Sequence, residues 1–325
     1  MQSQIQKICK ILREGSSFLV VSHLAPDGDA TGSTVGLGWI LKELGKPFTL
    51  YNGSGFPERN SWMSSPAPFE TELPADMPEW TIVLDCGDAH RAGDDFVAAL
   101  PNIKSVNIDH HLGNPEFATE NWVAPDQPAT AIMLAFIAKE LEIPLAGPLA
   151  EALYTAIITD TGGLSFGSTT PEAFEIVGEM VRNGLQHAVI QRHIYNTWST
   201  ARMSLLSLAL GATEHFQNEQ ISIMRVTTKM LKQTDTTKAD TEGFVNQLQK
   251  ITGNRVAVIF FELPDGSYKL SFRSNGKDDV RSAAVELGGG GHMNAAGGKI
   301  DGPYETAIPR VLELINKYVD LSEKV

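Results

Sequence analysis

The sequence predicts an α/β protein of two domains, a larger amino-terminal domain with a mostly parallel sheet and a smaller carboxy-terminal α/β domain. Three observations support this prediction. The chain has 325 residues, which corresponds to about two domains at roughly 100–200 residues each. Short strand patterns alternate with helical patterns in the first half, as they do in βαβ units. Hydrophobic residues make up 42% of the chain and charged residues 20%, the balance of a folded globular protein.

Strand and helix patterns alternate along residues 1–190, which we interpret as the larger domain. The run Ser17–Ser22 is short, apolar and β-branched, and a Gly/Asp loop separates it from the helical pattern at Thr31–Leu44. Further strands are expected at Phe48–Tyr51, Thr81–Leu84 and Ser105–Ile108, and further helices at Ala129–Leu141, Leu149–Thr159 and Pro171–Asn183. Strands that alternate with helices in this way form a mostly parallel sheet.

Residues 191–212 are expected to form a linker helix, because Trp198–Leu210 has a helical pattern. Residues 213–325 are interpreted as the smaller domain. Its strands are expected at Ile221–Val226, Val256–Glu262 and Tyr268–Arg273, and its helices near Thr241–Lys250, Val280–Glu286 and Thr306–Tyr318. The dipeptide Asp265-Gly266 lies between two apolar runs and is typical of a β-hairpin turn.

Several classes of protein are excluded by the composition. No apolar run approaches the roughly 18–20 residues that cross a bilayer. The segment Met1–Glu14 has apolar residues at helical spacing, but it lacks the continuous apolar core and cleavage site of a signal peptide. The chain has two cysteines, Cys9 and Cys86, too few for a disulfide framework or a four-cysteine zinc site. We therefore expect a cytoplasmic protein in a reducing compartment.

The acidic charge of the chain is unevenly distributed. The formal net charge is −13, of which residues 1–205 carry −12 and residues 206–325 carry −1. An excess of acid argues against broad electrostatic binding to duplex nucleic acid. The acidic half is suited to metal cations and the balanced half to an anionic substrate, although acidity that only aids solubility remains an alternative.

Four groups of acids and histidines stand at the ends of predicted elements. They are His23-Leu24-Ala25-Pro26-Asp27-Gly28-Asp29, Asp85-Cys86-Gly87-Asp88, Asp109-His110-His111 and Asp160. The first three follow strands, and the carboxyl ends of parallel strands open onto one shared crevice. So many carboxylates without a counter-charge would be costly, and cations are the simplest relief. Carboxylate and imidazole without thiolate favour Mn²⁺ or Mg²⁺ over structural zinc.

Each group taken singly also has a structural interpretation. An Asp-x-Asp in a glycine-containing loop is commonly a turn or a helix cap. A single His-His pair is commonly packing, and a single aspartate near a helix end is commonly structural. Four such groups at the ends of strands and helices favour a metal site. A carboxylate shared by two ions would place them about 3.5–4 Å apart, the arrangement used for phosphoryl hydrolysis.

These residues resemble the motifs of the DHH phosphoesterases, and Gly288–Gly291 with His292 resembles the signature of the associated DHHA1 domain. The resemblance covers essentially the whole chain and is closest to the NrnA-type oligoribonucleases that are also phosphatases of 3′-phosphoadenosine 5′-phosphate (PAP). The supporting stretches are SHLAPDGDATGS, NIDHHLGN, LYTAIITDTGGLSF, DTEGFVN and GGGGHMNAAGG. The resemblance implies a DHH domain, a DHHA1 domain and an active site in the cleft between them. Whether Asp88 also points into the site stays open.

The resemblance also implies a role for each site residue. His23 and Asp27 would hold one ion, Asp29, His110 and Asp160 would hold the other, and Asp85 would bridge both. Asp109 would orient its neighbours, and His111 would meet the scissile phosphate or the leaving oxygen. The cofactors would be two Mn²⁺ ions, with Mg²⁺ as the alternative.

The second half supplies candidate substrate-binding residues. Consecutive glycines let backbone N–H groups approach an anion, so Gly289, Gly290, Gly291 and His292 are interpreted as a binding loop, with a flexible loop or a helix C-cap as the alternative. The resemblance adds Arg273 and Ser274. An arginine suits bidentate phosphate contact, although a surface arginine is more common. Arg91 is a weaker candidate.

The expected activity is metal-dependent hydrolysis of very short RNA to mononucleotides and of PAP to AMP. The partners would be short single-stranded RNA and small nucleotides, without duplex DNA or membrane. The alternatives are a phosphodiesterase for cyclic or linear dinucleotides and, in a different class, a nucleotide-binding regulator that has lost catalysis. The oligomeric state stays open, with a homodimer as one option.

Overall fold

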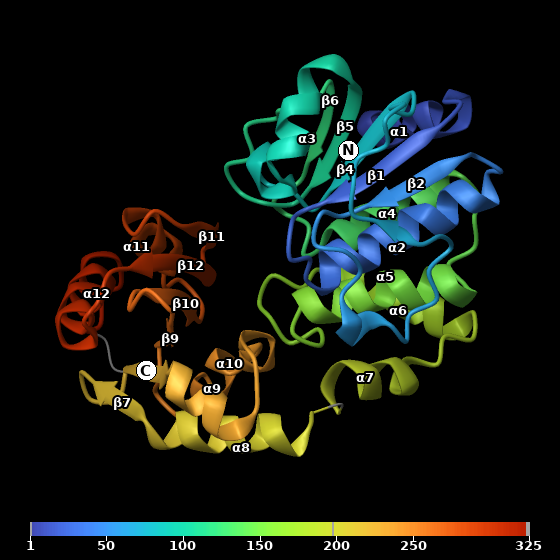
Figure 1. The fold of residues 1–325 in the computed structure, drawn as a ribbon. Coiled ribbons are helices and arrows are strands. Elements are labelled where there is room, and N and C mark those ends of the chain that lie inside the picture. The colour runs from blue at the N-terminus through green and yellow to red at the C-terminus, as the bar shows by residue number, and fades with distance from the viewer. Residues whose placement is uncertain (1, 197, 323–325) are drawn as a thin grey trace. The chain divides into compact units, whose positions relative to one another are not determined.

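The computed structural model describes residues 2–196 and 198–322. The chain divides into two compact units, Met1–Thr197 and Trp198–Val325 (Figure 1). Each unit has its own sheet of six strands, so the predicted two-domain α/β architecture is confirmed. Within the described residues, no helix has the length and apolar character needed to span a bilayer.

The sheet of the first unit is parallel throughout, with the strand order β3-β2-β1-β4-β5-β6. Its strands are β1 (Phe18–Ser22), β2 (Phe48–Tyr51), β3 (Phe69–Glu70), β4 (Trp80–Leu84), β5 (Lys104–Asp109) and β6 (Glu120–Val123). The chain runs outward from β1 in one direction and then returns to β4 on its other side. The order therefore reverses between β1 and β4, and such a switch point is where open α/β sheets bind ligands.

Helices cover both faces of this sheet (Figure 1). They are α1 (Gln2–Glu14), α2 (Gly28–Glu43), α3 (Asp94–Ala99), α4 (Thr130–Glu140), α5 (Gly147–Asp160), α6 (Pro171–Arg182) and α7 (His187–Tyr195), with 3₁₀ turns η1 (Glu58–Asn60), η2 (Ala89–Ala92) and η3 (Leu100–Asn102). Val20 and Ile82 face the large core that α1, α2, α4 and α5 complete. Val21 and Val83 face the opposite side, where Phe96 of α3 packs.

Three glycines bring α2 unusually close to α5. A Cβ at Gly32 would lie 2.4 Å from the Ala152 carbonyl oxygen, and one at Gly36 would lie 2.6 Å from Leu153 Cδ2. At Gly28 the nearest atom would be Thr159 Oγ1 at 2.2 Å. Side chains at these positions would force the two helices apart or displace their neighbours, so the glycines set the spacing along α2 and α5, and Gly28 sets it between the first turn of α2 and the last turn of α5.

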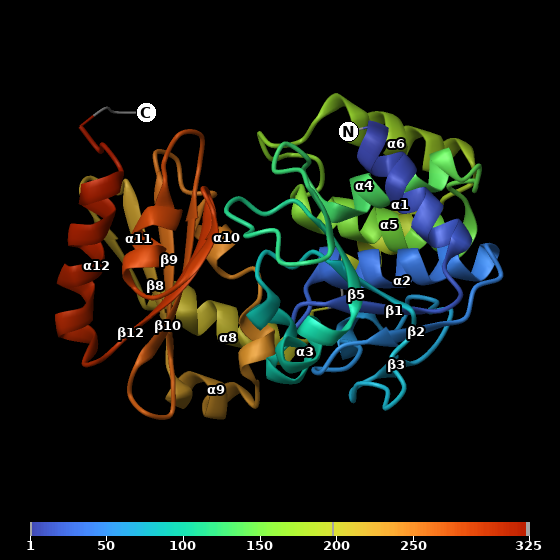
Figure 2. The same cartoon turned by 90° about the horizontal axis from the view of Figure 1, so that it is seen from above.

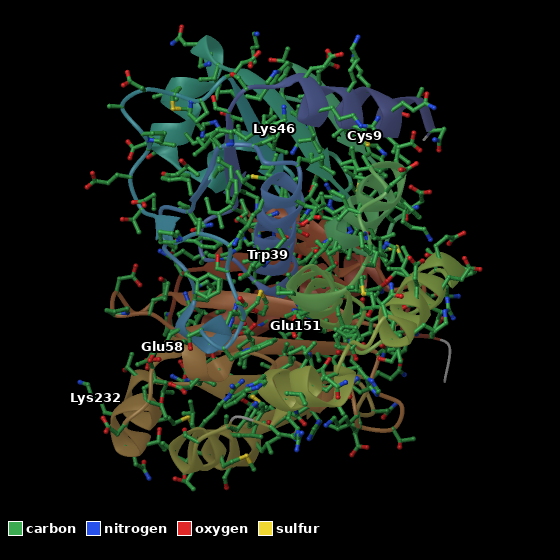
Figure 3. The ribbon with its side chains drawn as sticks, turned by 90° about the vertical axis from the view of Figure 1, so that its right-hand side faces the viewer. Cys9, Trp39, Lys46, Glu58, Glu151 and Lys232 are labelled. Atoms are coloured by element: carbon green, nitrogen blue, oxygen red, sulfur yellow. The ribbon has the colours of Figure 1, made fainter. Side chains whose placement is uncertain are left out.

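The segment between β2 and β4 is tied to the outer side of α2. The indole of Trp39, labelled in Figure 3, donates to the Ser64 carbonyl oxygen at 3.0 Å. Lys42, one turn further along, lies 4.5 Å above the Trp39 ring. This long segment therefore has a fixed anchor although it contains little regular structure.

The second unit is built on a mixed sheet with the strand order β11-β12-β10-β9-β8-β7, in which only β8 and β9 are parallel. Its strands are β7 (Thr213–Phe216), β8 (Ile221–Val226), β9 (Val256–Glu262), β10 (Tyr268–Ser274), β11 (Gly290–His292) and β12 (Ala295–Ile300). The helices are α8 (Thr200–Gly211), α9 (Thr228–Thr234), α10 (Val245–Leu248), α11 (Val280–Glu286) and α12 (Tyr304–Tyr318), with the turn η4 (Lys238–Thr241).

Each face of the second sheet has its own core. One core contains Val311 of α12 and Ala284 of α11, and the other contains Leu205 and Ala209 of α8. Figure 2 shows α12 and α8 on opposite sides of the strands. The helix that was expected to link the domains is thus packed as part of the second unit, which begins at Trp198.

Two expectations for the second unit need correction. The helix expected at Thr241–Lys250 is only the short α10, because Gly243 takes a left-handed φ of +76° between η4 and α10. The glycine run is not an open loop throughout, since Gly290 and Gly291 begin β11 and pair with Gly297 and Ala296. The pairing requires glycine: a Cβ at Gly291 would lie 2.4 Å from the Ala295 carbonyl oxygen.

The alternative interpretation of the glycine run, a helix C-cap, is correct for its first residue. Gly288 follows the C-cap residue Leu287 of α11 and has a φ of +68°. Its N–H donates to Val285 O at 3.0 Å, and the N–H of Gly289 donates to Ala284 O at 3.0 Å. The run therefore ends a helix and starts an edge strand within four residues.

Candidate metal centre

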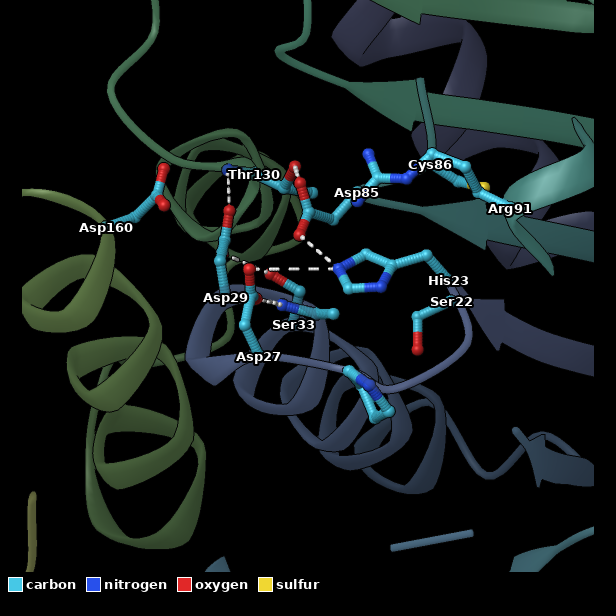
Figure 4. A network of polar contacts seen from close by, with 12 residues as sticks. Ser22, His23, Asp27, Asp29, Ser33, Asp85, Cys86, Arg91, Thr130 and Asp160 are labelled. Atoms are coloured by element: carbon cyan, nitrogen blue, oxygen red, sulfur yellow. Dashed lines mark hydrogen bonds and ion pairs between the residues drawn. The ribbon is translucent and has the colours of Figure 1, made fainter. Parts of the chain in front are cut away.

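Three of the four predicted groups meet at the switch point because their strands end in register. Ser22 of β1 lies opposite Leu84 of β4, and Leu84 lies opposite Ile108 of β5. His23, Asp85 and Asp109 therefore follow one another along the carboxyl edge of the sheet, and Figure 4 shows His23 and Asp85 there. Asp85 has a φ of +52°, a conformation that non-glycine residues rarely adopt. Its N–H donates to Ile108 O at 3.1 Å, which holds this turn.

His23 and Asp27 form one half of the centre with Asp85. His23 Nε2 lies 3.8 Å from Asp27 Oδ2 and 3.7 Å from Asp85 Oδ2. The other ring nitrogen, Nδ1, donates to the Leu24 carbonyl oxygen at 2.8 Å. Nε2 is buried and has no hydrogen-bond partner in the structure. A histidine whose Nδ1–H is held by a carbonyl presents a bare Nε2, the usual state of a metal ligand.

His110 occupies the equivalent position in the other half. Its Nε2 lies 3.3 Å from Asp160 Oδ2, 3.5 Å from Asp85 Oδ1 and 3.7 Å from Asp29 Oδ2. Its Nδ1 donates to the Gln127 carbonyl oxygen at 3.0 Å. Asp160 comes from the last turn of α5 and Asp29 from the first turn of α2, so the close packing of these helices brings the two carboxylates to the same imidazole.

Asp85 belongs to both halves, because one of its oxygens faces His23 and the other faces His110. Among the described residues, three groups of possible ligand atoms share Asp85, and the atoms of each group lie within 4.8 Å of one another. Two of them form the two halves of the centre, His23 with Asp27 and Asp85, and Asp29 with Asp85 and His110; the third is Asp85 with Asp109 and His111. Ligand atoms around one cation lie about 3–3.6 Å apart. The separations of 3.3–3.8 Å between Nε2 and oxygen are close to this range and longer than hydrogen bonds of about 2.7–3.2 Å.

The charges in the centre also suit a cation. Burial, together with the charges of Asp85 and its neighbours, raises the pKa of Asp29 well above its usual value and that of Asp160 to about 7. Burial acts on Asp85 as well, but His110, His111 and His23 outweigh it and lower the Asp85 pKa. The raised pKa values reflect the crowding of carboxyl groups in a buried site, which a divalent cation would relieve.

Asp29 is fixed by the amino terminus of α4. Its carboxylate accepts the N–H groups of Thr130 at 2.7 Å and Ala131 at 3.2 Å, and the hydroxyl of Ser33 at 2.9 Å. Figure 4 shows Thr130 beside Asp29 and Asp85. The Thr130 hydroxyl also donates to Asp85 Oδ1 at 3.4 Å. A helix amino terminus favours negative charge, so α4 orients this carboxylate before any ligand binds.

Asp109 and His111 form a connected pair beside the centre. Asp109 is fully buried, and its Oδ1 accepts the Nδ1–H of His111 at 2.8 Å. Its Oδ2 accepts Asn114 Nδ2 at 2.7 Å. On the other edge of the ring, Arg91 Nη1 donates to His111 Nε2 at 3.0 Å. Gly87 leaves room for this ring, since a Cβ there would lie 2.9 Å from His111 Cβ.

Asp88 does not join the centre. It is exposed and its carboxylate caps η2 by accepting the N–H of His90 at 2.8 Å. Cys86 is buried and its sulfur lies 3.0 Å from the Asp88 carbonyl oxygen. Of the four residues after β4, only Asp85 therefore faces the histidines.

Sequence reasoning missed several residues that position the centre. Asn52 follows β2 and is buried, and its side chain donates to the His23 carbonyl oxygen at 2.9 Å and to Ser22 Oγ at 3.1 Å. Arg59 donates to the Pro26 carbonyl oxygen at 2.9 Å. Asn52 stands at the end of a predicted strand on the same edge of the sheet, and this position was the available signal. No sequence signal pointed to Arg59 or Thr130.

The candidate residues of the second unit lie at one end of its sheet. Arg273 of β10 pairs with Ala295 of β12, which pairs with His292 of β11. Residues directly opposite one another point to the same face, so Arg273 and His292 share a face. Ser274 is buried, donates to the Asp278 carbonyl oxygen at 2.6 Å and accepts Asn294 Nδ2 at 2.9 Å. Its hydroxyl is thus part of the turn that follows β10.

A parallel sheet with acids and imidazoles at its switch point, followed by a mixed-sheet unit, matches a known class of proteins. The DHH family, N-terminal domain, matches residues 17–157, and the DHHA1 domain matches residues 220–320. The chain belongs to the DHH family, so the resemblance found in the sequence is confirmed.

Relatives and solved structures extend this match over nearly the whole chain. A protein of Thermus thermophilus named bifunctional oligoribonuclease and PAP phosphatase NrnA is 30% identical over 97% of this chain and 94% of its own. A Bacillus subtilis protein of the same name is 26% identical over 87% of this chain and 89% of its own. The crystal structure of an exopolyphosphatase-related protein from Bacteroides fragilis has a TM-score of 0.88 and 27% identity over 98% of this chain and 97% of that one.

Proposed function

We propose that this chain is a phosphoesterase that hydrolyses very short RNA to mononucleotides and PAP to AMP. The observation that carries the proposal is the position of Asp85, whose two oxygens face the Nε2 atoms of His23 and His110. A carboxylate between two such groups suits a pair of cations that act on one phosphoryl group. The relatives named as oligoribonucleases and PAP phosphatases support the choice of substrates.

We propose that His23 and Asp27 hold one cation, that Asp29, His110 and Asp160 hold the other, and that Asp85 bridges them. Mixed imidazole and carboxylate donors without thiolate fit Mn²⁺, with Mg²⁺ as the alternative. When bound, the cations would supply an activated water and would stabilise charge on the phosphoryl oxygens. The buried Nε2 of His23, which has no partner, is the atom that most directly supports this assignment.

His111 and Arg91 are proposed to act on the substrate itself. Asp109 holds the Nδ1–H of His111, which leaves Nε2 as the atom that faces outward to Arg91. With a proton on Nε2, His111 can donate to the leaving oxygen, and the guanidinium of Arg91 can then pair with a phosphate oxygen. Asp109 would contact neither the leaving oxygen nor the phosphate, and would act by fixing the orientation of the His111 ring.

The DHHA1 unit is proposed to bind the nucleotide portion. Arg273 and His292 lie on one face of its sheet, with β12 between their strands, and a guanidinium on the same face as an imidazole suits an anionic ligand. Gly289, Gly290 and Gly291 are proposed to assist by letting the ligand approach a backbone without side chains, although the N–H of Gly289 already donates to Ala284 O. Ser274 is proposed to shape the turn that follows Arg273.

A hydrolysis panel tests this function. It contains the 5′-phosphorylated dinucleotide pApA, short RNAs, PAP and cyclic dinucleotides, each with Mn²⁺ and after chelation. We expect turnover of pApA, short RNA and PAP that stops with chelation and returns with Mn²⁺. Preference for cyclic dinucleotides would point to a dinucleotide phosphodiesterase instead, and binding without turnover would point to a regulator.

A further inference from the structure

The loop that follows α5 begins at a residue of the candidate metal centre. Asp160 is the last residue of the helix, and its Oδ2 lies 3.3 Å from His110 Nε2. The next residues, Thr161 to Thr169, connect α5 to α6. The start of this loop is therefore adjacent in the chain to the place where a phosphate would be hydrolysed.

Hydrogen bonds hold the start of this loop in a tight turn. The Thr161 carbonyl oxygen accepts the N–H groups of Ser165 and Phe166, both at 3.0 Å. The Thr161 hydroxyl accepts the N–H of Leu164 at 3.0 Å. Gly162, Gly163 and Leu164 all have positive φ values, of +57°, +72° and +66°. Three successive left-handed residues reverse the chain within one turn, so the position of the following residue is well defined.

The turn sends Leu164 and Phe166 in different directions. Leu164 packs against the main core of the unit. Phe166 is 44% exposed, and its ring lies against Gly162, where a Cβ would come within 2.4 Å of a ring carbon. The Phe166 ring thus packs on the backbone of Gly162, two residues after Asp160, while much of the Phe166 side chain stays exposed to solvent.

Tyr195 lies next to the same glycines. It is the last residue of α7 and is 48% exposed. Its hydroxyl donates to the Ile158 carbonyl oxygen at 3.4 Å and is 3.6 Å from a Cβ placed at Gly163. Two exposed aromatic residues therefore lie at consecutive glycines that are two and three positions after Asp160.

We propose that Phe166, with Tyr195 at the neighbouring glycine, is a stacking platform for a nucleobase of the substrate, an inference that rests on the proposed nucleotide chemistry of this centre. Every base has a π-face, and aromatic side chains bind single-stranded nucleotides by stacking without regard to sequence. The phosphate and base of a nucleotide are joined through one sugar, so a phosphate at the centre brings its base to the neighbouring surface. Such a platform would let one site accept both short RNA and PAP.

Substrates with and without nucleobases measure how much base stacking on Phe166 contributes to kcat/KM. The kcat/KM for pApA is compared with that for the same ribose–phosphate backbone carrying hydrogen in place of both bases. Phe166→Ala should lower kcat/KM for pApA by roughly 5- to 150-fold, the range of one base stack, and should change the base-free substrate little. Phe166→Leu, which keeps an apolar side chain over Gly162, should behave like Phe166→Ala, and Phe166→Trp should retain activity on pApA.

The matched control is Phe174→Ala, because Phe174 on α6 is a phenylalanine of similar exposure, 53%. This variant should leave both substrates unchanged. Equal losses on the two substrates with Phe166→Ala or Phe166→Leu, or no loss on pApA, would overturn the platform.

A binding measurement separates this proposal from the proposed function. The fluorescence of 2-aminopurine falls when the base stacks. A dinucleotide that contains 2-aminopurine therefore reports stacking on Phe166 independently of hydrolysis. Quenching should occur with the wild type and Phe166→Trp and be lost with Phe166→Ala. Quenching that does not depend on Phe166 would contradict the platform even if hydrolysis is confirmed. Quenching that depends on Phe166 without any hydrolysis would support the platform and refute the proposed activity.

Discussion

The imidazole of His111 is held by Asp109, which accepts its Nδ1–H at 2.8 Å from a fully buried position at the end of β5. Burial raises the pKa of Asp109, but the hydrogen bond and charge of His111 and the amide of Asn114 outweigh it, so the Asp109 pKa is lowered. The carboxylate is therefore ionised across the neutral range and can fix one ring nitrogen while the other faces outward.

Asp109→Asn should reduce kcat without removing metal. An amide can present its N–H₂ group to the ring and no longer fixes the tautomer of His111. Removing a residue that orients a functional group costs about 10–100-fold. The control is Asp88→Asn, an exposed aspartate that only caps η2, which should stay close to wild type. Loss of bound metal in Asp109→Asn would instead make Asp109 a metal ligand.

Gly32→Ala should weaken both the fold of the first unit and its metal affinity. A Cβ at this position meets the backbone oxygen of Ala152 at 2.4 Å, and overpacking of this kind costs about 1–3 kcal/mol. The displaced helices carry Asp29 and Asp160, so their carboxylates should separate. Urea unfolding and metal titration measure the two effects.

The control for this glycine is Gly178→Ala on α6, where the nearest atom to a Cβ is the end of Arg182 at 3.6 Å. Alanine is favoured over glycine within a helix by roughly 0.5–1 kcal/mol, so this variant should be neutral or more stable. A Gly32→Ala protein as stable as wild type would show that α2 and α5 are not closely packed.

The second unit should depend on one buried ion pair. Arg255 and Asp278 are both buried, with Arg255 Nε 2.9 Å from Asp278 Oδ2 and Nη2 2.5 Å from Oδ1. Asp278→Asn leaves a buried guanidinium without its charge partner, which costs about 3–5 kcal/mol. The exposed pair Lys299–Asp265 provides the control, since Lys299→Gln should cost less than about 1 kcal/mol. Similar denaturation midpoints for the two variants would refute this difference.

The centre was predictable from the sequence because three of its residues stand at the ends of short buried strands. His23, Asp85 and Asp109 each come at the end of an apolar run, and parallel strands bring such positions together whatever the loops do. The position of Asn52 after a predicted strand was an available signal. The left-handed conformation at Asp85 and the contacts of Thr130 were not predictable, since they depend on segments that are distant in the chain.

The strands that the sequence did not reveal are short or rich in glycine. The two-residue β3, Phe69–Glu70, follows a Ser/Pro-rich segment and exists through its pairing with β2. Gly290 and Gly291 begin β11 although glycine disfavours strands. At Gly291 only glycine permits the close approach of β12, since a Cβ would lie 2.4 Å from the Ala295 carbonyl oxygen. Such elements are determined by partners elsewhere in the chain, which local patterns do not show.

The most direct test of the account is the metal stoichiometry of Asp85→Ala beside its turnover of pApA. The bridging position of Asp85 between His23 and His110 predicts about two Mn²⁺ per wild-type chain. The folded variant should lose at least one of them and have no measurable hydrolysis of any substrate. A folded Asp85→Ala protein that binds the same amount of Mn²⁺ and turns over pApA at a rate near wild type would contradict the shared carboxylate and the assignment of two cations.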